Sequence, residues 1–171
     1  GAFSDCSSLM SIEIPNSVTT IGEWTFYNCS SLTSIEIPNN VTTIGDRAFE
    51  GCSGLTGDLI ISEGVEKICF CAFRGCSGFK GDLTIPEGVK EIGADAFAWC
   101  SGLTGDLTIP ESVEKIGVCA FKGCSGFKGR LTIPKGVKEI CEGAFYGCSG
   151  FEGDLTIPES VEKIGVFAFE G

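Results

Sequence analysis

Phenylalanine returns at a nearly constant interval along the whole chain, and this interval limits the folds that the chain can adopt. Eight phenylalanines from Phe3 to Phe169 follow one another at steps of 23, 23 and then five times 24 residues. A cysteine stands three residues after seven of them, from Cys6 to Cys148. These steps define about seven modules of 23–24 residues over positions 1–171. One module cannot bury its own apolar side, whereas stacked modules form a continuous core, so the spacing predicts a solenoid.

The module that begins at Cys76 shows what each repeat is expected to form. Residues 83–85 alternate apolar, polar and apolar side chains, which predicts a short strand with one buried face. Pro86 lacks an N–H donor and should end this strand. Residues 89–92 predict a second, shorter extended segment. The spacing within 96–100 suits one tight helical turn of the 3₁₀ type, with its phenylalanine and cysteine directed inward.

Charged residues support stacking of equivalent positions. One column of the repeat alternates acid and base, and the adjacent column alternates in the opposite sense. The two columns are Glu66, Lys90, Glu114, Lys138, Glu162 and Lys67, Glu91, Lys115, Glu139, Lys163. Direct stacking places each charge next to opposite charges, so the columns favour this register.

Composition excludes several classes of function. The chain has 12 Lys and Arg against 23 Asp and Glu, a net charge of -11, which argues against nucleic acid as a partner. No apolar run approaches the ~18 residues of a membrane span, so no membrane insertion is expected. The chain has no histidine and no catalytic or metal-binding motif, so we expect neither an enzyme nor a bound metal or other cofactor.

Residues 32–55, LTSIEIPNNVTTIGDRAFEGCSGL, resemble the BspA-like, or Treponema-type, leucine-rich repeat. That family repeats roughly LxxLxLPxxLxxIxxxAFxxCxxL, and the likeness extends over essentially the whole chain. The resemblance implies a β-rich solenoid: a right-handed leucine-rich-repeat coil with parallel strands on its concave side and short 3₁₀ or turn segments. It also implies a secreted or cell-surface protein that binds a protein or glycan, often in adhesion.

Three groups of residues are candidates for binding. The aromatic residues Trp99, Tyr27 and Tyr146 lie outside the core rows and are expected to be exposed. Thr84, Thr108 and Thr132 form a strand column that could donate hydrogen bonds to a ligand, although threonine is also a favoured strand residue. Asp82, Asp106 and the inserted Arg130 share a further column, which is either a strip for a cationic ligand or a solvated turn. Apolar pairs that recur in every second module predict a partner surface or local packing: 70–71, 118–119 and 166–167.

The eleven cysteines have a structural interpretation. Seven form the inward row, where cysteine acts as a small apolar residue. The others are Cys69, Cys71, Cys119 and Cys141. Among these, Cys71 and Cys119 are two modules apart, roughly 10 Å, which is too far for a disulfide. We expect no disulfides among the four.

Two classes of function remain open from the sequence. The first is a surface recognition or adhesion module for a protein or glycan, and the second is a structural spacer without a specific ligand. The chain begins and ends at the same point of the module, without a polar cap. We therefore expect a fragment of a longer array that could stack end to end with copies of itself.

Overall fold

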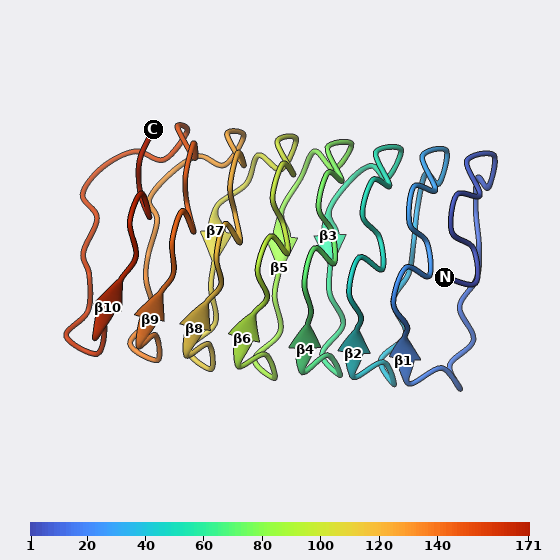
Figure 1. Ribbon diagram of the computed structural model, residues 1–171, viewed down its shortest axis with the longest axis horizontal. Coiled ribbons are helices and arrows are strands. Elements are labelled where there is room, and N and C mark those ends of the chain that lie inside the picture. The colour runs from blue at the N-terminus through green and yellow to red at the C-terminus, as the bar shows by residue number, and fades with distance from the viewer.

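The computed structural model describes residues 1–171 as one row of stacked coils without a helix (Figure 1). Two parallel sheets run along the row, and every strand has two residues. The seven-stranded sheet contains β1 (Thr20–Ile21), β2 (Thr43–Ile44), β4 (Lys67–Ile68), β6 (Glu91–Ile92), β8 (Lys115–Ile116), β9 (Glu139–Ile140) and β10 (Lys163–Ile164). The three-stranded sheet contains β3 (Leu59–Ile60), β5 (Leu83–Thr84) and β7 (Leu107–Thr108). The predicted solenoid of parallel strands is confirmed.

Equivalent residues of successive modules are paired in both sheets. Ile92 of β6 pairs with Ile116 of β8, and Leu83 of β5 pairs with Leu107 of β7. The predicted charge columns form three ion pairs, Lys115–Glu91 at 3.0 Å, Lys138–Glu114 at 2.8 Å and Lys163–Glu139 at 2.7 Å. The stacking of each module directly on the next, without slippage, is therefore confirmed.

The relative extent of the two sheets differs from the prediction. Residues 83–85 were expected to form the longer of the two extended segments, yet only three copies of this segment form strands. The copies of residues 89–92 supply all seven strands of the larger sheet. Most copies of the first segment are followed by proline, as at Pro86, and proline has no N–H to continue the ladder. In the second segment the donors are available: Gly117 N donates to Ile92 O at 2.9 Å.

The turn after the second strand is a series of β-turns and not the predicted 3₁₀ segment. In residues 93–100, backbone hydrogen bonds of 3.1–3.2 Å run from Ala96 N to Gly93 O, from Ala98 N to Asp95 O and from Cys100 N to Phe97 O. Asp95 and Trp99 have φ values of 53° and 64°. A left-handed residue at every fourth position interrupts a 3₁₀ helix and is typical of type II turns.

The remaining N–H groups of this turn segment connect the coils. Asp95 N, Phe97 N and Trp99 N donate to the carbonyl groups of Val118, Ala120 and Lys122 of the next coil, at 2.7–2.8 Å. Alternate N–H groups thus close a turn or bond the adjacent coil. The turn segment is thus hydrogen-bonded to its neighbour at every second residue, as a parallel strand is, although its backbone is not extended.

The core contains the predicted row of phenylalanines. Adjacent rings of the row lie 5.1–5.6 Å apart between centroids and within 15° of parallel. The rings of Phe73, Phe97 and Phe121 are fully buried in it. A second row joins Phe127 to Phe151 at 5.9 Å. No polar or charged residue is buried, so packing of apolar side chains holds the coils together.

Candidate functional site

The stacked turn segments form one side of the solenoid, which we call the turn ridge. It comprises residues 1–5, 22–28, 45–51, 69–75, 93–99, 117–123, 141–147 and 165–171. Every non-glycine residue with a left-handed φ lies on this ridge: Asp5, Trp24, Asn28, Arg47, Cys71, Asp95, Trp99, Cys119 and Phe167. The ridge therefore concentrates the backbone strain of the molecule.

Both tryptophans of the chain, and Phe167, occupy such strained positions on the ridge. Trp99 has φ 64° and is 49% exposed, Trp24 has φ 59° and is 39% exposed, and Phe167 has φ 57° and is 59% exposed. Five modules have glycine at the position of Trp99: Gly51, Gly75, Gly123, Gly147 and Gly171. A non-glycine side chain at left-handed φ costs about 1–2 kcal/mol, a cost that glycine avoids.

Two basic side chains of the ridge each lie between two aromatic rings. The guanidinium carbon of Arg47 lies 4.9 Å from the ring centroids of both Trp24 and Phe70. We call this group the first clamp. Each of its members comes from a different coil, and each aromatic ring lies within the range of a cation–π interaction.

A second clamp repeats the arrangement farther along the ridge. Lys122 Nζ lies 5.9 Å from the ring centroid of Trp99 and 5.2 Å from that of Tyr146. The order is again an aromatic residue, a cation in the next coil and an aromatic residue in the third. Two copies of one arrangement make the turn ridge the best-organised candidate site of the molecule.

The cations of the two clamps differ in their acidic partners. Arg47 Nη1 lies 2.7 Å from Glu50 Oε2, and the other oxygen of Glu50 lies 3.4 Å from Arg74 Nη1. Lys122 has no carboxylate within ion-pair distance, so its charge is compensated less directly. The second clamp therefore presents a cation that is free to pair with a ligand.

The three aromatic residues that the sequence predicts to be exposed differ in their exposure in the structure. Trp99 and Tyr146 are exposed and share the second clamp. The expected exposure of Tyr27 is wrong: Tyr27 is half-buried, because its ring packs edge-on against Trp24 at 4.7 Å. Sequence reasoning also missed the two cations. Their offsets of 23–24 residues from each aromatic partner are the signal that identifies them.

The recurring apolar pairs lie on the same ridge. Phe70, Val118 and Val166 are exposed, at 38%, 42% and 61%. Their neighbours differ, because Cys71 is buried whereas Phe167 is exposed. The first member of each pair thus contributes to the surface.

The predicted threonine, aspartate and arginine residues lie away from the ridge, on and beside the three-stranded sheet, where Thr84 and Thr108 belong to β5 and β7. Thr84, Thr108 and Thr132 pair in register and are exposed. Shallow depressions of about 260 and 540 Å³ bring them beside Asp82, Asp106 and Arg130. In the same aspartate column the carboxylate of Asp58 accepts the N–H of Asp82 at 3.0 Å, which favours a role in the turn. No three acidic or thiol groups of the chain converge on a common point.

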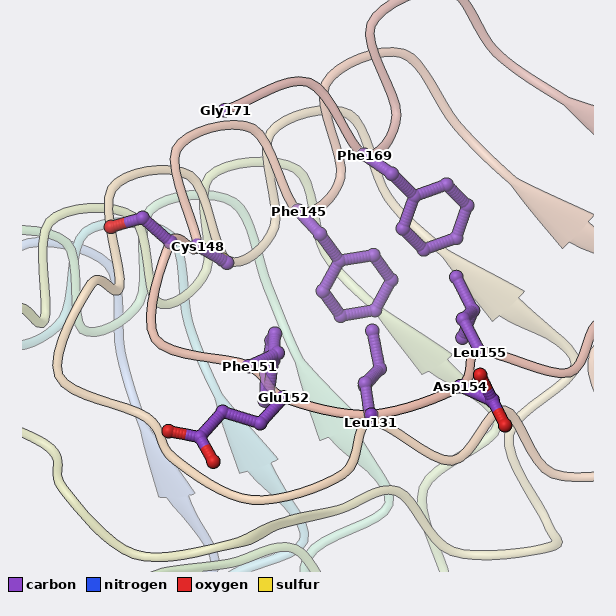
Figure 2. Close-up of a pocket in the computed structure, with 11 residues that line it drawn as sticks. Leu131, Phe145, Cys148, Phe151, Glu152, Asp154, Leu155, Phe169 and Gly171 are labelled. Atoms are coloured by element: carbon purple, nitrogen blue, oxygen red, sulfur yellow. The ribbon is translucent and has the colours of Figure 1, made fainter.

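A small cavity of about 180 Å³ opens between the last coils (Figure 2). Figure 2 shows the rings of Phe145 and Phe169 side by side, with Leu131 and Leu155 next to them. The cavity is thus lined largely by the side-chain rows of the core. It is a continuation of the hydrophobic interior and not a separate binding site.

All eleven cysteines are free thiols. The inward row does more than fill space, because its thiols donate hydrogen bonds to backbone carbonyl groups at 3.0–3.1 Å. Burial raises the pKa of Cys52 and of Cys148 to about 12, so their nucleophilic thiolate forms are rare at neutral pH. This row therefore has a structural role.

The likeness to known proteins extends over the repeats of the whole chain. The family model of the BspA type leucine-rich repeat region matches residues 1–128 and 90–171, in six copies. The chain belongs to this family. The comparison with curated proteins found no match. The structure contains no helix able to cross a membrane.

Three solved structures share the BspA-type fold. A leucine-rich repeat protein of T. pallidum is 33% identical, with a TM-score of 0.77 over 86% of this chain and 67% of that one. A leucine-rich repeat protein from Bacteroides ovatus is 26% identical, with a TM-score of 0.61 over 99% and 60%. A leucine-rich cell surface protein from Faecalibacterium prausnitzii is 29% identical, with a TM-score of 0.58 over 94% and 58%. The chain spans about three fifths to two thirds of these relatives.

Proposed function

We propose that this chain is a recognition module of a secreted or cell-surface protein, and that it binds a protein or glycan through the turn ridge. One observation carries the proposal: Trp24, Trp99 and Phe167 hold exposed aromatic rings at left-handed backbone positions. Glycine would avoid the backbone strain at these positions, and each ring still leaves a large part of its surface exposed. A ligand that covers the rings supplies a reason for them.

The composition of the ridge supports the same proposal. Tryptophan, tyrosine and arginine are the residues that most often dominate binding energy at protein surfaces. The exposed side chains of Val118 and Val166, like Phe70 of the first clamp, add apolar area to the ridge. The surface location of the relative from Faecalibacterium prausnitzii supports an extracellular site. The proposal assigns no catalytic step to the chain.

The alternative is a structural spacer, which the regular stacking of the coils favours. A spacer requires only the core rows and the charge columns. It gives no account of two tryptophans on one ridge, both in strained conformations. The two functions therefore make different predictions for substitutions on the ridge.

The decisive experiment replaces Trp99 with glycine, the residue at the equivalent position in five other modules. Trp99→Gly relieves the strain, so the variant is expected to keep its circular dichroism spectrum and its urea midpoint. Glycan arrays and pull-down from extracellular extracts then compare it with the wild-type chain. We expect that Trp99→Gly no longer captures the ligand. Thr108→Ala, which alters the three-stranded sheet and not the ridge, should still capture it. Equal capture by all three chains would exclude Trp99 and the ridge as the binding site, and no capture by the wild type would favour the spacer.

A further inference from the structure

We propose that the second clamp, Trp99, Lys122 and Tyr146, binds a sugar residue that carries one carboxylate, with the sugar ring on the indole and the carboxylate on Lys122. This inference rests on the proposed function and specifies its ligand at one site. The three side chains provide two aromatic rings and a cation, whose Nζ lies 5.9 Å from the ring centroid of Trp99 and 5.2 Å from that of Tyr146. The following steps argue each part of the assignment.

The indole of Trp99 lies against the backbone of the next coil. A Cβ atom at Gly123 would stand 2.4 Å from Cε3 and 2.6 Å from Cζ3 of the indole, so the ring fills the space that a side chain would take. The ring is 49% exposed on its remaining surface. A supported, half-exposed aromatic ring suits the apolar C–H face of a pyranose, which stacks on it without entering a pocket.

The chemical groups of this area suit a sugar. None of the depressions named above includes Trp99, Lys122 or Tyr146. A sugar ring presents an apolar C–H face that stacks on an aromatic ring, and an acidic sugar carries a carboxylate that pairs with the cation between the two rings. A peptide is the competing occupant, and the experiment below separates the two.

Lys122 is unusual among the basic residues of its coil. Residues 115–138 contain six Lys and Arg residues and no Asp or Glu. Five of the six have an acidic residue at the same position of an adjacent coil, as Lys115 has Glu91 and Lys138 has Glu114. The residues adjacent to Lys122 in its column are Ala98 and Tyr146. Its ammonium group therefore has no acidic partner within the stack.

The surrounding charges limit the ligand to one carboxylate. Asp95 and Glu142 lie on the same ridge. Burial raises the pKa of the Cys119 thiol, both carboxylates raise it further, and Lys122 lowers it. The whole chain has a net charge of -11. A polyanion with a charge on every unit would be repelled by these groups, whereas a single acidic sugar in a neutral glycan meets mainly Lys122.

The test compares sugars that differ only in the carboxylate. Sialyllactose is paired with lactose, and a disaccharide that ends in glucuronic acid is paired with its glucose analogue. Saturation-transfer and chemical-shift NMR measure binding to the full chain. We expect each acidic sugar to bind roughly tenfold more tightly than its neutral partner, as one charge-assisted hydrogen bond allows. Contacts should map to the indole signal of Trp99.

Two variants assign the carboxylate contact. Lys122→Gln should lower the affinity for the acidic sugar to that for the neutral one and leave the urea midpoint nearly unchanged, because Lys122 forms no ion pair in the fold. Lys128→Gln removes the same charge from the same coil away from the clamp, and it should retain the wild-type affinity. Raising NaCl to about 0.5 M should weaken binding of the acidic sugar only.

Several results would overturn the inference. Equal binding of acidic and neutral sugars, or no effect of Lys122→Gln, excludes Lys122 as the carboxylate partner. If no sugar binds while Trp99→Gly abolishes capture of a protein, the recognition function holds and the sugar assignment fails. Competition for the clamp by a short glutamate-containing peptide, without sugar binding, also replaces the sugar with an acidic peptide. If Trp99→Gly changes no binding of any kind, the proposed function fails with it.

Discussion

The thiol of Cys100 donates a hydrogen bond to the carbonyl oxygen of Phe73, with a distance of 3.1 Å. The same oxygen accepts the backbone N–H of Cys76 at 3.1 Å, so both of its lone pairs are used. The relationship recurs from coil to coil, with thiol distances of 3.0–3.1 Å. Cysteine thus fills a small apolar space and satisfies a buried carbonyl group.

Substitution of Cys100 by alanine should destabilise the array. It removes the sulfur from a fully buried site and leaves the Phe73 carbonyl with one hydrogen bond. We expect a loss of about 1–3 kcal/mol in the free energy of unfolding, measured by urea denaturation. Cys6→Ala is the control, because Cys6 is exposed. Equal midpoints for both variants would contradict a structural role of the thiol row.

The thiol row should also make the protein sensitive to alkali. Burial raises the pKa of Cys52 and of Cys148 from 9.0 to about 12, and it raises the pKa of Cys76, Cys100 and Cys124 as well. Unfolded thiols ionise from about pH 9, whereas the folded ones stay protonated. Stability that is complete below pH 9 is therefore lost between about pH 9 and 12, by ~1.4 kcal/mol per pH unit for each thiol.

Urea midpoints measured at several pH values across this range provide the test. The midpoint should fall steeply above pH 9 for the wild-type chain. Cys76→Ala lacks one buried thiol and should show a shallower dependence, which separates the thiols from lysine and tyrosine titration. Identical slopes for the two chains would exclude the thiols as the cause.

The repeat interval predicted the stacking because one side chain at one position, such as Phe97, has the same chemistry in every coil. Equivalent positions must then lie together, whatever the local conformation. The local conformation itself was less predictable. The spacing did not show which of the two extended segments forms the continuous sheet, and positive φ values at Asp95 and Trp99 produced β-turns where the spacing had favoured a 3₁₀ segment.

The candidate site was predicted in part, for a related reason. Trp99 stood out because glycine holds its position in other modules, and glycine there marks the left-handed φ. Lys122 was missed, because its role depends on rings that lie one coil before and one coil after it. Tyr27 was misjudged because its column suggests exposure, whereas Trp24 of its own coil covers it.

Loss of one ring from the phenylalanine row should be costly. The ring of Phe97 is fully buried and lies 5.6 and 5.3 Å from those of Phe73 and Phe121. Phe97→Ala should lower the free energy of unfolding by about 3–5 kcal/mol in urea denaturation. Phe3 is 37% exposed and stacks on one ring only, so Phe3→Ala should cost much less. A similar cost for the two would refute the continuous core.

The charge columns should control the ionisation of their own members. The ammonium group of Lys138 hydrogen-bonds the carboxylate of Glu114 at 2.8 Å and holds the pKa of Glu114 below its usual value. Lys138→Gln should raise this pKa, as NMR titration of the carboxyl carbon would detect. A carboxyl with a depressed folded pKa favours the folded state above its unfolded pKa of 4.5 and loses this effect as the pH falls. The variant should therefore differ from the wild type near neutral pH and converge with it in acid, and the difference should shrink in high salt. An unchanged pKa of Glu114 in Lys138→Gln would show that the column pairs do not persist in solution.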